Sequence, residues 1–157
     1  MGLDMYLEKR TFIGAEYKHR EVKGTCNITA EGKKVPIKFN RITSISERVG
    51  YWRKANQIHA WFVKNVQKGK DDCGDYHVTL EQLKELVATC KTILKNKGKA
   101  SELLPSQGGF FFGGTDYDEY YFDDLKYTVK MLNQIIKELE KEYANKNFSE
   151  IYYRSSW

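Results

Sequence analysis

Two polar segments of the sequence carry residue types that can bind a ligand or move a proton. The first spans residues 51–62, YWRKANQIHAWF, and combines basic, amide, imidazole and aromatic side chains. Arg53 and Lys54 can hold a phosphate, while aromatic rings can stack on a base. His59 is a residue type suited to general base catalysis near neutral pH. The segment therefore indicates an anion-binding site, with acid–base chemistry as an alternative.

Helical periodicity places two polar residues of this segment on an apolar face. On a helical wheel Asn56 and His59 fall beside Trp52 and Val63. A buried amide or imidazole without a partner costs about 1–3 kcal/mol, so both side chains need hydrogen bonds. The partners form either a ligand pocket or a structural polar network, and both interpretations stay open. Trp61 falls on the opposite side, where we expect it to meet solvent or a partner unless a loop covers it.

The second polar segment is GGFFFGGTDYDEYYFDD, residues 108–124. A glycine turn before a helix N-terminus can cradle a phosphate, but the acids at this helix start would repel one. We therefore favour a well-capped helix behind a tight turn. Tyr121 lies at the centre of the apolar stripe of this helix, and Asp118 and Asp124 fall within its wide arc near Tyr117. Acids in that position need partners, which the first segment can supply.

The two segments together predict an aromatic-lined polar pocket between the first and third helices. No cofactor and no metal ion is expected, because Asp71, Asp72, Asp75 and His77 match no metal-binding spacing. No residue is assigned a catalytic role. The predicted ligand-binding residues are Trp52, Arg53, Lys54, Asn56, His59, Tyr117, Asp118, Tyr121 and Asp124.

The elements that must position these residues form an α+β fold in one domain, residues 1–157. We expect about three helices packed on a small, mainly antiparallel sheet. Strands are predicted at 3–13, 110–112 and 148–155, with a hairpin at 25–39. One helix is predicted at 80–96, where Thr79 and Gln82 have capping-box spacing. Another is predicted from a cap at Asp116, paired with Glu119, to about residue 145.

Residues 41–66 allow two interpretations. Ser44 and Glu47 have the spacing of a capping box for a helix that continues to the end of this stretch. Alternatively, residues 41–49 form a strand that leads into a helix starting near Tyr51. The apolar residues fit both periodicities, so the choice stays open.

Composition limits the classes of protein to which the chain can belong. Of its 157 residues 41% are apolar and 14% aromatic, which excludes a disordered chain. The sequence has no apolar run near the roughly 20 residues that cross a bilayer, and its start does not resemble a signal peptide. We therefore expect a cytoplasmic protein without a membrane partner. Three cysteines without CxxC spacing argue against a disulfide framework, and Cys90 is expected in the core.

Charge is distributed unevenly along the chain. The net charge is +5, but residues 1–70 carry +9 and residues 71–157 carry −4. A basic first half can attract phosphate-rich ligands. Alternatively, the halves form complementary faces of one domain or of a homo-oligomer. Because the sequence contains no nucleic-acid-binding signature, nucleic acid is not among the expected partners.

Four segments of the chain carry a family resemblance. MGLDMYLEK, YWRKANQIHAWFV, LLPSQGGFFFGGTDYDEYYFDDL and YYRSSW resemble an uncharacterised family of small proteins encoded by bacteriophages and prophages. The resemblance runs from the first residue to the last, and it implies no established fold, activity or cofactor. It does imply an accessory protein made in the cytoplasm of a bacterial host. Such proteins bind host proteins or sequester nucleotide signals of antiviral defence.

Three functional hypotheses follow. The first is a non-enzymatic binder of a small anionic, nucleotide-like ligand, which would sequester a host defence signal. The second is a protein-binding inhibitor or homo-oligomeric module that uses Trp61 and other exposed aromatic residues. The third is a hydrolase in which His59 acts as general base, oriented by Asp118 or Asp124.

Overall fold

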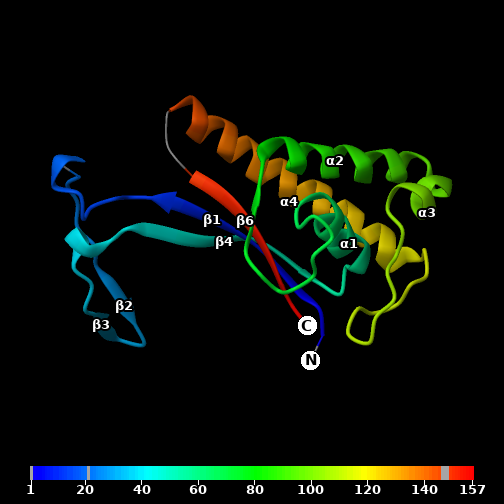
Figure 1. Cartoon of the computed structure of the whole chain (residues 1–157), viewed down its shortest axis with the longest axis horizontal. Coiled ribbons are helices and arrows are strands. Elements are labelled where there is room, and N and C mark those ends of the chain that lie inside the picture. The colour runs from blue at the N-terminus through cyan, green and yellow to red at the C-terminus, as the bar shows by residue number, and fades with distance from the viewer. Residues whose placement is uncertain (1, 21, 146–148) are drawn as a thin grey trace.

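An antiparallel sheet covered by helices on one face forms the body of the protein, and a small hairpin projects from it (Figure 1). The structure is a computed structural model that describes residues 2–20, 22–145 and 149–157. The four strands of the main sheet lie in the order β4–β1–β6–β5, which confirms the predicted α+β fold class. The strands are β1 (Asp4–Phe12), β2 (Ile28–Ala30), β3 (Lys33–Val35), β4 (Ser44–Arg53), β5 (Tyr76–Val78) and β6 (Ser149–Ser156). The helices are α1 (Asn56–Asn65), α2 (Leu80–Lys95), α3 (Ala100–Leu103) and α4 (Glu119–Ala144), with 3-10 turns η1 (Lys18–Arg20), η2 (Phe39–Arg41) and η3 (Lys97–Lys99).

Alternating side chains on the two central strands separate the core from the outer face. On β1, Met5 and Leu7 are fully buried, whereas Tyr6 between them points to the other face and is half-buried. On β6, Ile151 and Tyr153 are buried in the same way. This period of two is the signature of a sheet with one face in the core. Both strands confirm the predictions for 3–13 and 148–155, except that residue 148 lies outside the described residues.

The helix predicted to begin at Ser44 is wrong, because residues Ser44–Arg53 form a strand paired with β1. The alternative, a strand that leads into a helix, is correct. The helix starts at Asn56 rather than near Tyr51.

A bulge in β4 explains why its periodicity was ambiguous. Leu7 pairs with Gly50, but Glu8 pairs with Arg48, so Val49 is the extra residue. The extra residue shifts the alternation by one position and produces spacings that also fit a helix.

Two long antiparallel helices, α2 and α4, cover the inner face of the sheet (Figure 1). The capping box of α2 is present as predicted, with Thr79 and Gln82 bonding each other's backbone N–H. The cap of α4 is Asp118 instead of the predicted Asp116, since the Asp118 side chain accepts from the Tyr121 N–H. Cys90 on α2 is fully buried, as predicted.

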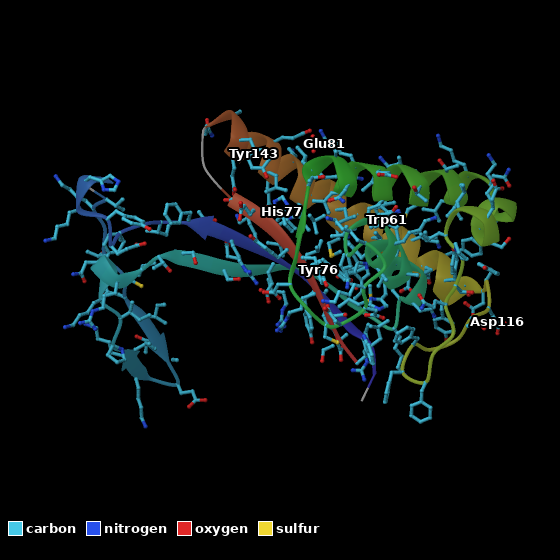
Figure 2. The ribbon with its side chains drawn as sticks, in the orientation of Figure 1. Trp61, Tyr76, His77, Glu81, Asp116 and Tyr143 are labelled. Carbon is cyan, nitrogen blue, oxygen red and sulfur yellow. The ribbon has the colours of Figure 1, made fainter. Side chains whose placement is uncertain are left out.

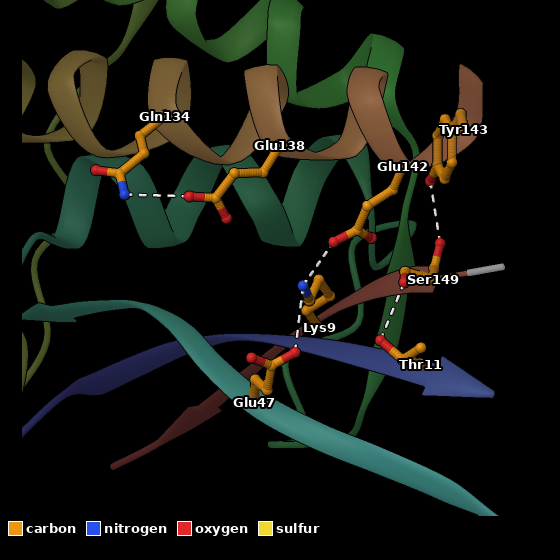
Figure 3. Close-up of polar contacts among 8 residues, drawn as sticks. All are labelled: Lys9, Thr11, Glu47, Gln134, Glu138, Glu142, Tyr143 and Ser149. Carbon is orange, nitrogen blue, oxygen red and sulfur yellow. Dashed lines mark hydrogen bonds and ion pairs between the residues drawn. The ribbon is translucent and has the colours of Figure 1, made fainter. Parts of the chain in front are cut away.

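The end of α4 is fixed to the sheet by polar contacts (Figure 3). Lys9 on β1 donates to Glu142 at 2.8 Å and pairs with Glu47 on β4 at 3.2 Å. Tyr143 donates to the Ser149 carbonyl at 3.2 Å. Burial, the largest single effect, favours the neutral form of Glu142, but the hydrogen bonds from Lys9 and Ser149 and the charge of Lys9 together outweigh it and lower the pKa of this carboxyl.

The predicted hairpin at 25–39 is confirmed as β2 and β3, which form a two-stranded sheet of their own. The turn between the strands places Glu31 and Gly32 at φ 50° and 75°. Neither strand contains a buried residue. Together with the flanking segments, the hairpin forms an arm that projects from the far ends of β1 and β4 (Figure 1).

The buried strand predicted at Phe110–Phe112 is wrong. These residues form a turn in which the Phe112 N–H donates to the Gly109 carbonyl at 3.1 Å, and Phe110 is 96% exposed. Only Phe112 is buried. The glycines on both sides allow a tight turn, which leaves no room for a pairing strand. The short helix α3 lies between the predicted helix at 80–96 and the predicted strand at 110–112, where the sequence indicated no helix or strand.

Candidate functional site

A cleft forms between the β4–α1 junction, the glycine loop at 108–114 and the first turns of α4. Its volume is about 410 Å³, which suits a small organic ligand. Six of the nine predicted binding residues line it, and six others complete the wall. The lining residues are Arg53, Lys54, Asn56, Gln57, Gly113, Gly114, Asp116, Asp118, Tyr120, Tyr121, Asp123 and Asp124.

The basic wall of the cleft is formed where β4 ends. Arg53 is the last residue of the strand, and Lys54 follows with a left-handed φ of 59°. The Lys54 N–H donates to the Leu3 carbonyl at 2.8 Å, which holds this irregular residue against the residue that precedes β1. Both side chains are exposed, and neither forms an ion pair with a described residue. Two cationic groups therefore remain available to a ligand.

Gly113 allows the glycine loop to approach this basic wall. Its φ is 88°, and a Cβ at this position would lie 3.3 Å from the Lys54 Cβ. An L-residue here would be strained and crowded. The glycine is thus required by the turn and by contact with Lys54, which agrees with the interpretation that these glycines make a tight turn before a capped helix.

Asn56 holds the glycine loop in place. Its Nδ2 donates to the carbonyls of Phe112 at 3.1 Å and Gly114 at 2.8 Å, and its Oδ1 accepts from the Gln107 N–H at 2.8 Å. Asn56 is buried, as predicted, but all three partners are backbone groups of the loop. The residue therefore shapes the wall of the cleft.

The acidic wall comes from the start of α4, and three of its four carboxylates have protein partners. Asp118 caps the helix, and Asp123 pairs with Lys126 at 2.7 Å. Asp124 accepts a hydrogen bond from Gln57 at 3.1 Å. Burial raises the pKa of Asp124, although the Gln57 bond opposes this effect. Asp116 points outward at the rim of the cleft (Figure 2).

Two predicted tyrosines lie at or near the acidic wall. Tyr121 lines the cleft and donates its hydroxyl proton to the Leu104 carbonyl at 2.7 Å, while burial raises its pKa. Tyr117 packs edge-on against Tyr121 with ring centroids 5.0 Å apart, but it lies on the other side of Asp118, away from the cleft. These contacts fix the loop that precedes α4.

Trp52 and His59 are buried outside the cleft. The Trp52 indole donates to the Thr128 hydroxyl at 2.8 Å, which joins β4 to α4 within the core. His59 is fully buried, as the wheel predicted, with Nδ1 2.7 Å from the Tyr153 hydroxyl and Nε2 3.0 Å from Asp71. The partners expected on the third helix are wrong, since Asp71 and Tyr153 come from a loop and from β6. The His59 network connects core elements and reaches solvent only at Asp71, whose side chain is 24% exposed and lies away from the cleft.

Trp61 is buried at 6% exposure, contrary to its expected solvent-facing position. Figure 2 shows it within the helical layer, and the segment at 102–105 lies beside it together with α2. The alternative that another segment of the chain covers Trp61 is therefore correct. A wheel drawn for one helix does not reveal that a second segment covers its other side.

Gln57 is a cleft residue that the sequence analysis missed. It is buried and binds Asp124, so it connects α1 to α4. The sequence did contain a signal for a role of Gln57 in the cleft, because this residue lies next to Asn56 and four residues from Arg53 in the same polar segment.

The comparisons with known proteins give no functional assignment. No family model, no curated protein and no solved structure matches the chain. Within the described residues, no group of three or more His, Cys, Asp or Glu side chains is arranged to hold a metal ion. No helix in the described part is long and apolar enough to cross a membrane.

Proposed function

We propose that the cleft binds a small phosphate-bearing ligand and holds it without chemical change. The observation that carries this proposal is the pair of cations at the β4–α1 junction, Arg53 and Lys54, which face the cleft without ion-pair partners among the described residues. A phosphate offers the acceptor oxygens that such groups bind most strongly.

The charge of the acidic wall limits the kinds of ligand that can bind in the cleft. Four acidic residues, Asp116, Asp118, Asp123 and Asp124, line the cleft opposite the two cations. A ligand with negative charge along its whole length is therefore a poor fit. A nucleotide-like ligand fits better, because its phosphate end can meet Arg53 and its hydroxyl or amino groups can donate to Asp124.

The resemblance to bacteriophage and prophage proteins supplies the biological part of the proposal. In this context, the cleft would sequester a nucleotide signal that the host makes during antiviral defence. The action would take place in the host cytoplasm and would require one chain for each bound molecule.

The two alternative functions have weaker support. The protein-binding hypothesis relied on Trp61 together with other exposed aromatic residues; Trp61 is buried, whereas Phe110 and Tyr120 are exposed. The hydrolase hypothesis relied on His59 with Asp118 or Asp124, but His59 contacts Asp71 and Tyr153. A general base must reach the proton that it removes, and His59 is fully buried away from the cleft.

Recovery of the ligand after denaturation separates sequestration from catalysis. The chain is mixed with ADP-ribose or AMP in equal amount, the unbound nucleotide is removed by ultrafiltration, and the protein is then denatured by heat. The proposal predicts that intact nucleotide returns in a 1:1 ratio to parent protein and that little is retained by Arg53→Ala. Lys130→Ala removes an exposed cation from α4 and serves as the matched control. A cleaved product, or equal retention by all three proteins, would refute the proposal.

A further inference from the structure

The outer face of the main sheet, which the helices leave open, carries a layer of aromatic rings. Tyr6 on β1 lies directly opposite Tyr51 on β4, and their ring centroids are 5.6 Å apart. Tyr152 extends the layer on β6. Tyr51 is 37% exposed, and the other two are half-buried. The helices lie on the other side of the sheet, where Phe62 of α1 stacks on the inward-facing Tyr153 with centroids 4.0 Å apart.

Two arginines lie on this aromatic layer without acidic partners. The guanidinium carbons of Arg48 and Arg154 are 4.3 and 5.4 Å from the centre of the Tyr6 ring. Both residues are exposed, and neither forms an ion pair with any residue that the structure describes. Their N–H groups therefore remain available to an external anion. Stacking on Tyr6 restricts the two side chains before a ligand binds, which lowers the entropy lost on binding.

The acids of the same face are already used within the protein. Asp4 accepts from the Tyr51 hydroxyl, and Glu150 accepts from the Tyr152 hydroxyl at 2.8 Å. Glu8 pairs with Arg10 at 3.3 Å, and Asp75 also binds this arginine. Arg10 lies over Tyr152 but is neutralised by these two carboxylates. Asp4 and Glu150 keep their negative charge, because a tyrosine hydroxyl is neutral, but neither forms an ion pair with Arg48 or Arg154, whose positive charge remains available to a partner.

The arm formed by residues 13–43 adds further positive charge to this side of the molecule. It contains seven Lys or Arg and three Glu residues, so it carries +4 of the chain's net +5. Lys33, Lys34 and Lys38 are exposed on and beside its hairpin. Within the arm, the β2–β3 hairpin points away from α2 and α4 (Figure 1). The outer sheet face and the arm, which joins the end of β1 to the start of β4, together make up a basic and aromatic surface.

We propose that this surface binds single-stranded nucleic acid. Unpaired bases would stack on the layer of Tyr6, Tyr51 and the two arginines, and the phosphates would meet Arg48, Arg154 and the arm lysines. Antiparallel sheets with exposed aromatic residues suit unstacked bases, whereas a duplex keeps its bases inside, where these residues cannot stack on them. An acidic protein would use the charges but not the stacked rings.

The linear sequence concealed this surface, because its residues come from three strands that are distant in the chain. Arg48 and Arg154 meet at one tyrosine only after β1 pairs with both neighbours. The expectation that nucleic acid is not a partner rested on the absence of a contiguous signature. The proposal does not depend on the cleft, since neither arginine lines it.

Fluorescence anisotropy with labelled oligonucleotides tests the proposal. Fluorescein-labelled oligo-U and oligo-dT of about 12 nucleotides are titrated with the full chain at about 50 and 200 mM salt. We expect binding that weakens with salt. R48Q/R154Q should weaken it about tenfold or more and reduce the salt slope by about 1.4, since each lost phosphate contact removes about 0.7. The matched control is K91Q/K137Q, which removes two exposed cations from the helices and should change binding less than about twofold.

Three results would overturn the proposal. The first is no binding of either oligonucleotide at the lower salt concentration. The second is equal loss in R48Q/R154Q and K91Q/K137Q, which would indicate non-specific attraction. The third is a duplex of the same length binding as tightly as the single strand. Sedimentation velocity adds a direct check, because a dimer that R48Q/R154Q dissociates would assign the surface to a second copy of this chain. Circular dichroism of each variant verifies that the exposed substitutions leave the fold intact.

Discussion

Replacing Asn56 with alanine should both destabilise the protein and damage the cleft. The side chain makes three hydrogen bonds to the backbone of the glycine loop, at 2.8, 2.8 and 3.1 Å. At about 1 kcal/mol for each of the three bonds, Asn56→Ala should lower the free energy of unfolding by about 3 kcal/mol. For a chain of this size, that loss corresponds to a fall in melting temperature of about 9 °C.

Asn56→Asp keeps the volume of the side chain but changes its hydrogen-bonding groups, so it separates these two contributions to stability. The new carboxylate would keep an acceptor for the Gln107 N–H but would place negative charge against the carbonyls of Phe112 and Gly114. Burial and these carbonyls should raise the pKa of the introduced acid, so its cost should fall at low pH, where it is protonated, and increase as pH rises through that pKa. At pH 7 we expect Asn56→Asp to be at least as destabilising as Asn56→Ala.

Urea denaturation followed by tryptophan fluorescence measures these changes, since Trp52 and Trp61 are buried and report on unfolding. Asn65→Ala provides a matched control, because its amide makes one bond, to the Trp61 carbonyl at 2.8 Å, within the same helix. A loss below about 0.5 kcal/mol for Asn56→Ala would refute the view that Asn56 anchors the loop.

Three further predictions concern titratable groups. Burial raises the pKa of the Cys90 thiol to about 12, so a thiol reagent should modify exposed Cys73 in the native protein and Cys90 only after unfolding. Asp124→Asn should increase stability at pH 7, because it removes a carboxylate whose pKa is raised by burial, and the gain should vanish as pH falls below that pKa, as a pH series of thermal melts can show. Lys9→Met should cost about 2 kcal/mol at pH 7, since it leaves the Glu142 carboxylate half-buried without its cation. The lowered pKa of Glu142 adds stability above pH 4.5 that is lost as pH falls through the folded value, so urea titrations of Lys9→Met should show a weaker pH dependence there.

The helices and strands that could be predicted from the sequence are those whose apolar residues repeat with one clear period. β1 and β6 alternate with period two, and α2 combines an apolar stripe with a capping box, so local rules were sufficient. They failed at β4, because the Val49 bulge breaks the alternation and pairing with β1 then decides the conformation. They also failed at Phe110, where neighbouring glycines favour a turn over the strand suggested by three phenylalanines.

The candidate site was predicted in its location but not in its internal contacts. Arg53, Lys54 and Asp124 do meet in one cleft, since the polar residues of β4–α1 and α4 both face the space between these elements. His59 was correctly placed inside, but periodicity gives only a direction on one helix. It does not identify the element on the other side, and Asp71 and Tyr153 bind it.

Isothermal titration calorimetry of AMP and adenosine tests the phosphate-binding role of the cleft most directly. AMP should bind the parent chain with one site, and adenosine should bind at least about tenfold more weakly, because charge-assisted hydrogen bonds to phosphate contribute about 1.5–3 kcal/mol. Arg53→Ala should weaken AMP to the level of adenosine and leave the melting temperature nearly unchanged, since Arg53 is exposed, while Lys130→Ala should bind like the parent. Equal affinity for AMP and adenosine, or full AMP affinity in Arg53→Ala, would contradict the account.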